Sequence, residues 1–249
     1  ITPLLGNLDE PQSLQRLAGV ATHVVHMAPP PLQGETDPRT QHLVQALARR
    51  TAPFSVVYGS TSGVYGDCEG AWIDEKRAVN PTTPRAQRRV DAENWLQSWG
   101  RRGLPRVNVL RIPGIYALDR EGGTPRERLA RGTPVLQAAD DVYTNHVHAD
   151  DLARATVLAL WRGPKLQTLN VNDDSDLRMA DYMDLAASLW HMPKPPRISR
   201  LQAEKELPPM TLSFMSESRR MRNQRLKQSL RFKLRYPTVR EGLLGQPVF

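Results

Sequence analysis

The chain has 249 residues, 39% of them hydrophobic and 24% charged, and a formal net charge of +8. These values are typical of a globular protein with one substantial core, and no run approaches the roughly 18 apolar residues that a membrane helix needs. The single cysteine, Cys68, excludes an internal disulfide and favours a reducing compartment, so we expect a cytoplasmic protein without a membrane partner. The positive charge suits an anionic ligand.

Strand and helix patterns alternate along the first two thirds of the chain. Short apolar runs that end at proline, glycine or asparagine predict buried strands. A threonine followed by proline, at Thr83 and Pro84, predicts a helix start, and Asp150 with Asp151 is expected to cap a later helix. The predicted strands are 21–27, 54–58, 107–112 and 168–171, and the predicted helices are 14–17, 38–50, 84–100 and 152–160.

This alternation predicts β-α-β units and therefore an α/β fold with a doubly wound, mostly parallel sheet. Beyond Asp173 the pattern changes to a helix over 179–190, a proline-rich stretch and a basic stretch over 219–240. We interpret the basic stretch as a solvated surface, with a diphosphate-binding patch as the next interpretation. Nucleic acid is an unlikely partner, because the stretch lacks interleaved aromatic residues.

Four segments, in this order, resemble the extended and atypical short-chain dehydrogenase/reductase superfamily, which includes NAD-dependent nucleotide-sugar epimerases and dehydratases. They are ATHVVHMAPPP at 21–31, VVYGSTSGVYGD at 56–67, RIPGIY at 111–116 and NHVHADDLARA at 145–155. The resemblance implies a Rossmann-like domain over 1–118 and 145–174, and a small α+β substrate-binding subdomain over 119–144 and 175–249. It also implies NAD or NADP as the cofactor, and a nucleotide sugar or another small anionic molecule as the substrate.

The family's catalytic tyrosine and lysine, four positions apart, are both replaced by arginine. In the matching stretch PTTPRAQRRVDAE, at 81–93, Arg85 stands at the tyrosine position and Arg89 at the lysine position. Arginine has no neutral form near pH 7, so Arg85 cannot act as the general base. It can bind a phosphate or carboxylate through two parallel hydrogen bonds, and Arg89 can donate to ribose hydroxyls.

The resemblance assigns the remaining candidate site residues. Thr61 matches the hydroxyl residue that bonds the reacting oxygen, and Tyr65 is an alternative acid, so Thr61, Arg85 and Tyr65 are the candidate catalytic residues. No metal site is expected, although His146 and His148 lie close to two aspartates in sequence. The candidate cofactor-binding residues are Ala28, Pro29, Pro30, Ser60, Arg89, Pro113, Ile115 and Tyr116.

The glycine-rich turn that opens a Rossmann domain has no counterpart here. Residues 1–9, ITPLLGNLD, resemble the family's third strand and the turn after it. We therefore expect the native gene product to carry a preceding β-α-β unit of roughly 30 residues or more.

The leading functional hypothesis is an NAD(P)-dependent epimerase, dehydratase-like protein or reductase, monomeric or homodimeric, with an atypical active site. The alternative, motivated by the same missing tyrosine, is a non-catalytic dinucleotide sensor or scaffold. A nucleic-acid binder is the third hypothesis, and only the net charge supports it.

Overall fold

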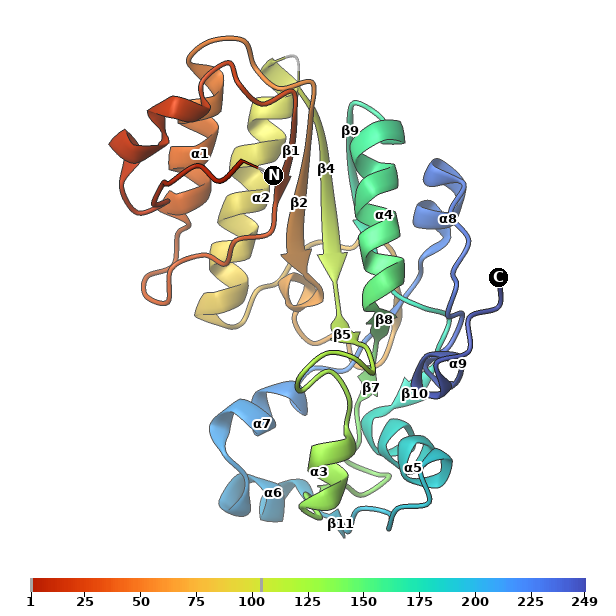
Figure 1. Ribbon diagram of the computed structural model, residues 1–249. Coiled ribbons are helices and arrows are strands. Elements are labelled where there is room, and N and C mark those ends of the chain that lie inside the picture. Colours follow the sequence, from red (N-terminus) through yellow and green to blue (C-terminus); the bar gives the residue numbers. More distant parts are fainter. Residues whose placement is uncertain (1, 104) are drawn as a thin grey trace.

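The computed structural model describes residues 2–103 and 105–249 (Figure 1). At its centre lies a parallel sheet of four strands in the order β1-β2-β4-β9. The strands are β1 (His23–His26), β2 (Ser55–Thr61), β4 (Arg106–Ile112) and β9 (Leu166–Asn170). Helices lie on both of its faces, so the predicted doubly wound α/β architecture is confirmed.

Two hydrophobic layers enclose the sheet. Helices α1 (Pro38–Ala48) and α2 (Pro84–Arg102) cover one face, while α4 (Ala149–Arg162) and α8 (Gln224–Leu230) lie against the other (Figure 1). Successive side chains of a strand point to opposite faces. Accordingly, Val56 and Tyr58 belong to the α1–α2 layer, whereas Val57 belongs to the α4–α8 layer.

Part of the basic stretch belongs to this sheet domain. Leu226 and Leu230 of α8 pack with Phe232 and Leu234 in the same core cluster as Val57. The sequence-based division placed residues 224–234 in the substrate-binding subdomain, whereas the structure packs them against the sheet. The α8 helix is amphipathic, and its apolar side completes the cover of the sheet.

The helix caps agree with the sequence in one case and differ in the other. The Thr83 side chain accepts a hydrogen bond from Ala86 N, as predicted. The cap of α4 is His148, whose Nδ1 accepts from Asp150 N at 3.2 Å, so the prediction that Asp150 and Asp151 cap this helix is wrong. Both aspartates lie inside the first turn, where their backbone is already helical.

The N-terminal segment also differs from its prediction. The structure describes residues 2–9 without a strand, while Ile1 lies outside the described residues. Local hydrogen bonds around Asn7 and Ser13 hold this segment in a turn, and Leu5 is 91% exposed. The predicted short helix over 14–17 is the 3-10 helix η1 (Pro11–Leu17).

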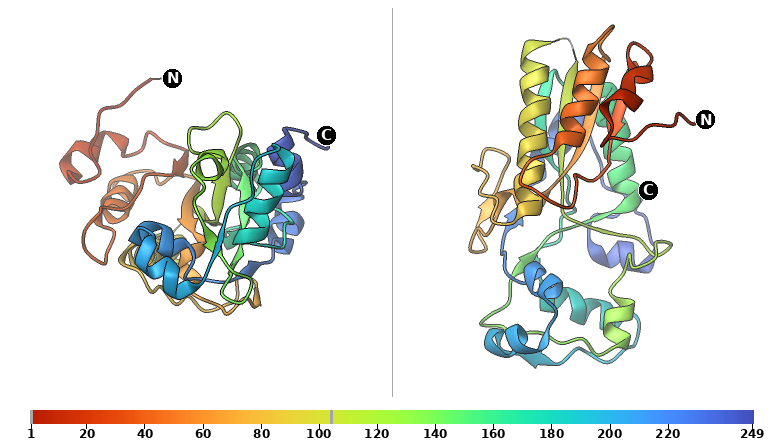
Figure 2. Two further views of the ribbon diagram at one scale, coloured as in Figure 1. Left: turned by 90° about the horizontal axis from the view of Figure 1, so that it is seen from below. Right: turned by 90° about the vertical axis from the view of Figure 1, so that its left-hand side faces the viewer.

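Shorter elements gather beneath the carboxyl end of the sheet (Figure 2). Four two-stranded ribbons connect them: β5 (Gly114–Tyr116) with β8 (His146–His148), β7 (Tyr143–Thr144) with β10 (Leu177–Arg178), β6 (Val135–Leu136) with β11 (Arg197–Ile198), and β3 (Trp72–Ile73) with β12 (Arg220–Met221). The helices here are η2 (Ser62–Tyr65), α3 (Arg126–Ala130), α5 (Met179–Leu189), α6 (Arg200–Glu206), α7 (Pro209–Phe214) and α9 (Val239–Leu244). None of the helices in the described part of the chain combines the length and apolarity needed to span a membrane.

Candidate active site

A cavity of about 590 Å³ opens between the carboxyl end of the sheet and the elements beneath it. This is within the usual range for a small-molecule site, and ligands of open α/β sheets bind at this edge. Its walls come from the end of β2, the start of α2, the turn between β4 and β5, the β7–β8 segment, α3, α5 and the residues before β12.

Four of the predicted site residues line this cavity together: Thr61, Arg85, Pro113 and Ile115. The parallel register explains the meeting of two of the segments, because Thr61 pairs with Ile112, directly before Pro113. Arg85 joins them because α2 begins beside the same edge. The sequence motifs, spread over three segments, therefore converge on one space.

Thr61 has a hydroxyl that can serve a ligand. Its Oγ1 accepts a 3.3 Å hydrogen bond from Gly63 N, and the side chain is only partly buried. A hydroxyl carries one proton to donate and a second lone pair. The turn thus fixes the position of Oγ1 while its proton stays available to an oxygen in the cavity.

The two arginines of the altered motif have different surroundings. Arg85 is exposed on the first turn of α2, and its guanidinium has no hydrogen bond or ion pair with another described residue. Arg89, one turn later, donates through Nη1 to Gly59 O at 2.8 Å and Tyr58 OH at 3.0 Å. Arg85 is thus free to bind a ligand, whereas Arg89 already donates hydrogen bonds to residues near the end of β2.

Four of the predicted cofactor-binding residues lie at the edge of the sheet beside β1 and β2. Ala28, Pro29 and Pro30 directly follow β1, which pairs with β2, so they lie at the same sheet edge as Thr61. The buried Nε of Arg89 has no partner among the described residues, and this guanidinium has further N–H groups for a ribose hydroxyl. Ala28, Pro29, Pro30 and Arg89 thus lie where the sequence predicts contacts with the cofactor.

The other predicted residues have side chains that are already engaged and do not line the cavity. The hydroxyl of Ser60 donates to Glu93 Oε1 at 2.5 Å, and that of Tyr65 donates to Asn170 Oδ1 at 2.7 Å. Tyr116 is 2% exposed, and its hydroxyl lies 3.3 Å from Thr238 O. The hydroxyl protons of these three residues are therefore already used inside the protein.

A buried ion pair supports the cavity from the sheet side. Arg111 of β4 meets Glu93 of α2 with an Nη2–Oε2 distance of 2.7 Å and an Nε–Oε1 distance of 3.2 Å. The Arg111 guanidinium also lies over the Tyr65 ring, 4.6 Å from its centroid. This two-bond pairing fixes the positions of β4 and α2, from which Pro113 and Arg85 reach the cavity.

Sequence analysis missed the residues that complete the cavity wall. These residues are Arg120, Arg128, His146, Tyr182, Glu217 and Arg219. His146 lies in the matched segment 145–155 but was considered only as a metal ligand, and Arg219 was included only in the basic stretch.

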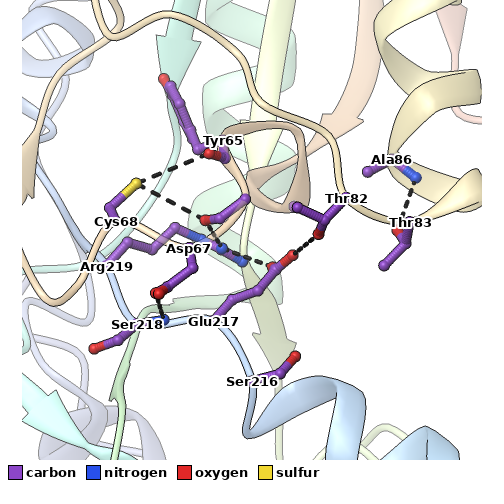
Figure 3. Close-up of polar contacts among 12 residues, drawn as sticks. Tyr65, Asp67, Cys68, Thr82, Thr83, Ala86, Ser216, Glu217, Ser218 and Arg219 are labelled. Carbon is purple, nitrogen blue, oxygen red and sulfur yellow. Dashed lines mark hydrogen bonds and ion pairs between the residues drawn. The ribbon is translucent and has the colours of Figure 1, made fainter.

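Glu217 and Arg219 join the sheet edge to the lower elements (Figure 3). Arg219 Nη1 lies 2.7 Å from Glu217 Oε2 and 2.6 Å from Gly66 O, and Thr82 Oγ1 donates to Glu217 Oε1 at 3.1 Å. Glu217 is the one carboxylate among the described lining residues, against four arginines. The cavity therefore attracts anions.

Burial lowers the pKa of His146 to about 4, so this cavity residue is neutral near pH 7. Its ring packs on Tyr182 with a centroid distance of 4.2 Å. Within residues 2–103 and 105–249, no three His, Cys, Asp or Glu side chains gather closely enough to hold a metal ion.

The fold and this cavity define a dinucleotide-binding α/β protein with an anion-attracting site at the carboxyl edge of its sheet. The model of the NAD dependent epimerase/dehydratase family matches residues 6–171, and the chain belongs to that family. Its coarse function is thus NAD-dependent and epimerase-like, and its cofactor is a nicotinamide dinucleotide, as the sequence predicted. No curated protein matches the chain.

Solved structures agree with the fold. A functionally unknown conserved protein from Silicibacter pomeroyi DSS is 30% identical over 89% of this chain and 76% of its own, with a TM-score of 0.73. MoeE5 in complex with UDP-glucose and NAD is 22% identical over 97% and 82%, with a TM-score of 0.75. RMD from Pseudomonas aeruginosa, complexed with NADPH, is 19% identical over 98% and 87%, with a TM-score of 0.76.

Proposed function

We propose that the chain is an NAD(P)-dependent epimerase or reductase of a nucleotide sugar or another small anionic molecule, and that the cavity is its active site. One observation carries this proposal: Arg85, at the family's tyrosine position, lines the same cavity as Thr61 and the Pro113–Ile115 turn without an anionic partner in the described chain. A free guanidinium at this place binds a carboxylate or phosphate rather than removing a proton.

In this proposal the cofactor lies along the carboxyl edge of the sheet. Ala28, Pro29 and Pro30 contact its adenosine side, and Arg89 donates to the ribose next to the nicotinamide. Ser60, Pro113, Ile115 and Tyr116 contribute through their backbone or ring surfaces. When bound, the nicotinamide supplies the acceptor or donor of a hydride. We further propose that the protein is cytoplasmic, and that it is a monomer or a homodimer.

The chain's own residues position the substrate. The Thr61 hydroxyl donates to the reacting oxygen, and Arg85 holds an anionic group beside it. Residues 119–144 and most of 175–249 form the substrate side of the cavity, while 1–118 and 145–174 form the cofactor side. The Arg111–Glu93 ion pair keeps β4 and α2 in register. A shift of either element would separate Arg85 from the Pro113–Ile115 turn, which resembles the family's turn beside the nicotinamide (the nicotinamide turn).

Calorimetric titration of the full-length protein with NADH and NADPH tests the proposal first. Micromolar binding of either nucleotide is expected, and no binding of both would overturn it. The double variant Arg85→Tyr with Arg89→Lys restores the family's acid and lysine, so we expect it to gain hydride transfer with UDP-glucose or UDP-glucuronic acid. The single variant Arg89→Lys is the matched control, because it restores the lysine alone.

A second candidate function is a dinucleotide sensor or scaffold without turnover. No carboxylate or imidazole among the described lining residues is both unpaired and basic enough to take a proton near pH 7, and this favours the second candidate. Glu217 is bonded to Arg219 and Thr82, and burial lowers the pKa of His146 to about 4. A sensor changes its partner binding with the ratio of NADH to NAD, whereas turnover of any substrate would exclude this candidate.

A further inference from the structure

The wall of the cavity opposite the sheet holds two side chains whose donor groups have no acceptor among the described residues. Arg128 lies on α3 and Tyr182 on α5, two helices that contact each other below the sheet (Figure 1). Both side chains line the same cavity as Arg85 and Thr61. They lie on the substrate side, away from the predicted cofactor residues.

Arg128 carries a charge that the protein does not balance. Its guanidinium is half-buried, and no carboxylate of the described chain forms an ion pair with it. Burial lowers the pKa of Arg128, and the nearby Arg131 charge lowers it further. Burying a guanidinium without an anion is unfavourable, so such a group indicates a ligand that supplies the anion.

Tyr182 supplies the second donor. The residue is 7% exposed, and its hydroxyl has no hydrogen-bond partner among the described residues. Burial raises the pKa of Tyr182, so the hydroxyl keeps its proton and can only act as a donor to an anion. The His146 ring, packed on it at a tilt of 34°, holds the phenol in position and adds no charge.

We propose that Arg128 and the Tyr182 hydroxyl together bind a phosphate or carboxylate group on the non-reacting part of the substrate. This inference rests on the proposed function, because it takes the cavity as the substrate site. Arg85 binds a first anionic group beside the nicotinamide turn, and Arg128 with Tyr182 binds a second. The substrate class is thereby narrowed to molecules that carry two separate anionic groups.

The first test measures the thermal midpoint of the full chain without ligand. Arg128→Met keeps the length and apolar stem of the side chain and removes the unbalanced charge, so we expect the midpoint to rise by about 2 to 4 °C. Arg131→Met, directly after α3, is the matched control. The Arg131 side chain is 66% exposed and its Nη1 lies 3.7 Å from Glu127 Oε2, so no measurable shift of the thermal midpoint is expected. A lower midpoint for Arg128→Met would assign Arg128 a structural role and overturn the inference.

The second test measures binding of inorganic pyrophosphate and of glutarate by calorimetry, with and without NADH. Arg128→Met is expected to weaken binding of the preferred anion roughly 10- to 100-fold, and Tyr182→Phe roughly 3- to 10-fold, as for the loss of charged and neutral donors. Arg131→Met is expected to leave it unchanged. Tighter binding of pyrophosphate would indicate a phosphate group on the substrate, and tighter binding of glutarate would indicate a carboxylate.

The two proposals fail in different ways. If NADH binds and anion affinity is the same in Arg128→Met as in the native chain, the anion site is wrong while the proposed function stands. If neither NADH nor NADPH binds and the Arg128-dependent anion affinity persists, the proposed function fails alone.

Discussion

Two arginines on opposite sides of the cavity have different surroundings: Arg111 lies in the sheet behind the cavity wall, and Arg128 lines the cavity. On the sheet side, Arg111 of β4 is 5% exposed and bonded twice to Glu93. In the wall below, Arg128 is half-buried and has no carboxylate partner in the described chain. The difference separates two uses of one side chain. A buried guanidinium with its own acid fixes the fold, while one without an acid is available to a ligand.

The same distinction divides the residues selected from the sequence. Ser60 and Tyr65 donate to acceptors inside the protein and therefore belong with Arg111. In the part of the chain that the structure describes, Arg85 and the Thr61 proton have no such acceptor, so they belong with Arg128. Substitutions of the residues bonded inside the protein should consequently change its stability. Substitutions of the residues without such a partner should change its affinity for a ligand.

The largest expected effect comes from breaking the paired region. Glu93→Gln leaves Arg111 buried without its counter-ion, so the free energy of unfolding should fall by about 3 to 5 kcal/mol. Urea denaturation measures this change. Glu127→Gln removes the acid of an exposed pair with Arg131 and should change stability by about 0.5 kcal/mol or less. Equal effects of the two variants would contradict the comparison.

The next effect appears as a dependence on pH. Burial lowers the pKa of His146 to about 4, whereas the unfolded chain takes up this proton near its ordinary value of 6.5. The folded pKa is the lower one, so this contribution to stability is complete above pH 6.5 and is lost as the pH falls toward 4.

His146→Phe keeps the aromatic packing on Tyr182 and removes the titration. The loss of unfolding free energy between pH 7 and pH 4 should shrink by up to about 3 kcal/mol. A decline remains, because burial also lowers the pKa of His26 to about 4. Identical declines in the variant and the native chain would show that folding does not lower the pKa of His146.

A smaller effect is expected at the C-terminal segment. Asp151 is fully buried and accepts hydrogen bonds from Arg154, from Arg235 N and from Tyr236 N. Asp151→Asn loses the charge and one acceptor, so unfolding free energy should fall by about 2 kcal/mol. Asp150→Asn is the control on the adjacent, exposed position, and chemical denaturation of both variants should separate them clearly.

The smallest change in stability is predicted for Arg85→Gln. The guanidinium touches no described partner, so unfolding free energy should stay within about 0.5 kcal/mol of the native value. Arg89→Gln, which removes hydrogen bonds to Gly59 O and Tyr58 OH, should destabilise more. A large loss of stability in Arg85→Gln would show that Arg85, like Arg111, stabilises the fold through contacts inside the protein.

The sheet and half of the site could be predicted because both depend on neighbours in sequence. Short apolar runs predicted the positions of β2 and β4, and the residues at the carboxyl ends of parallel strands meet at one edge of the sheet. This is why Thr61 and Pro113 lie in one cavity. Residues 1–9 were expected to hold a strand and the turn after it, and the described residues 2–9 hold a turn around Asn7 without the strand.

By itself, the sequence determined the class of fold, the family and the replacement of a titratable tyrosine by Arg85, because each is written in a local pattern. Only the tertiary structure decided which polar groups are satisfied. Arg128 and Tyr182 lie far apart in the chain and become neighbours through the packing of α3 on α5. Glu93 neutralises Arg111 only because α2 crosses β4 at that point. Whether a charge has a partner is a property of three-dimensional contacts, and no sequence spacing in this chain encodes it.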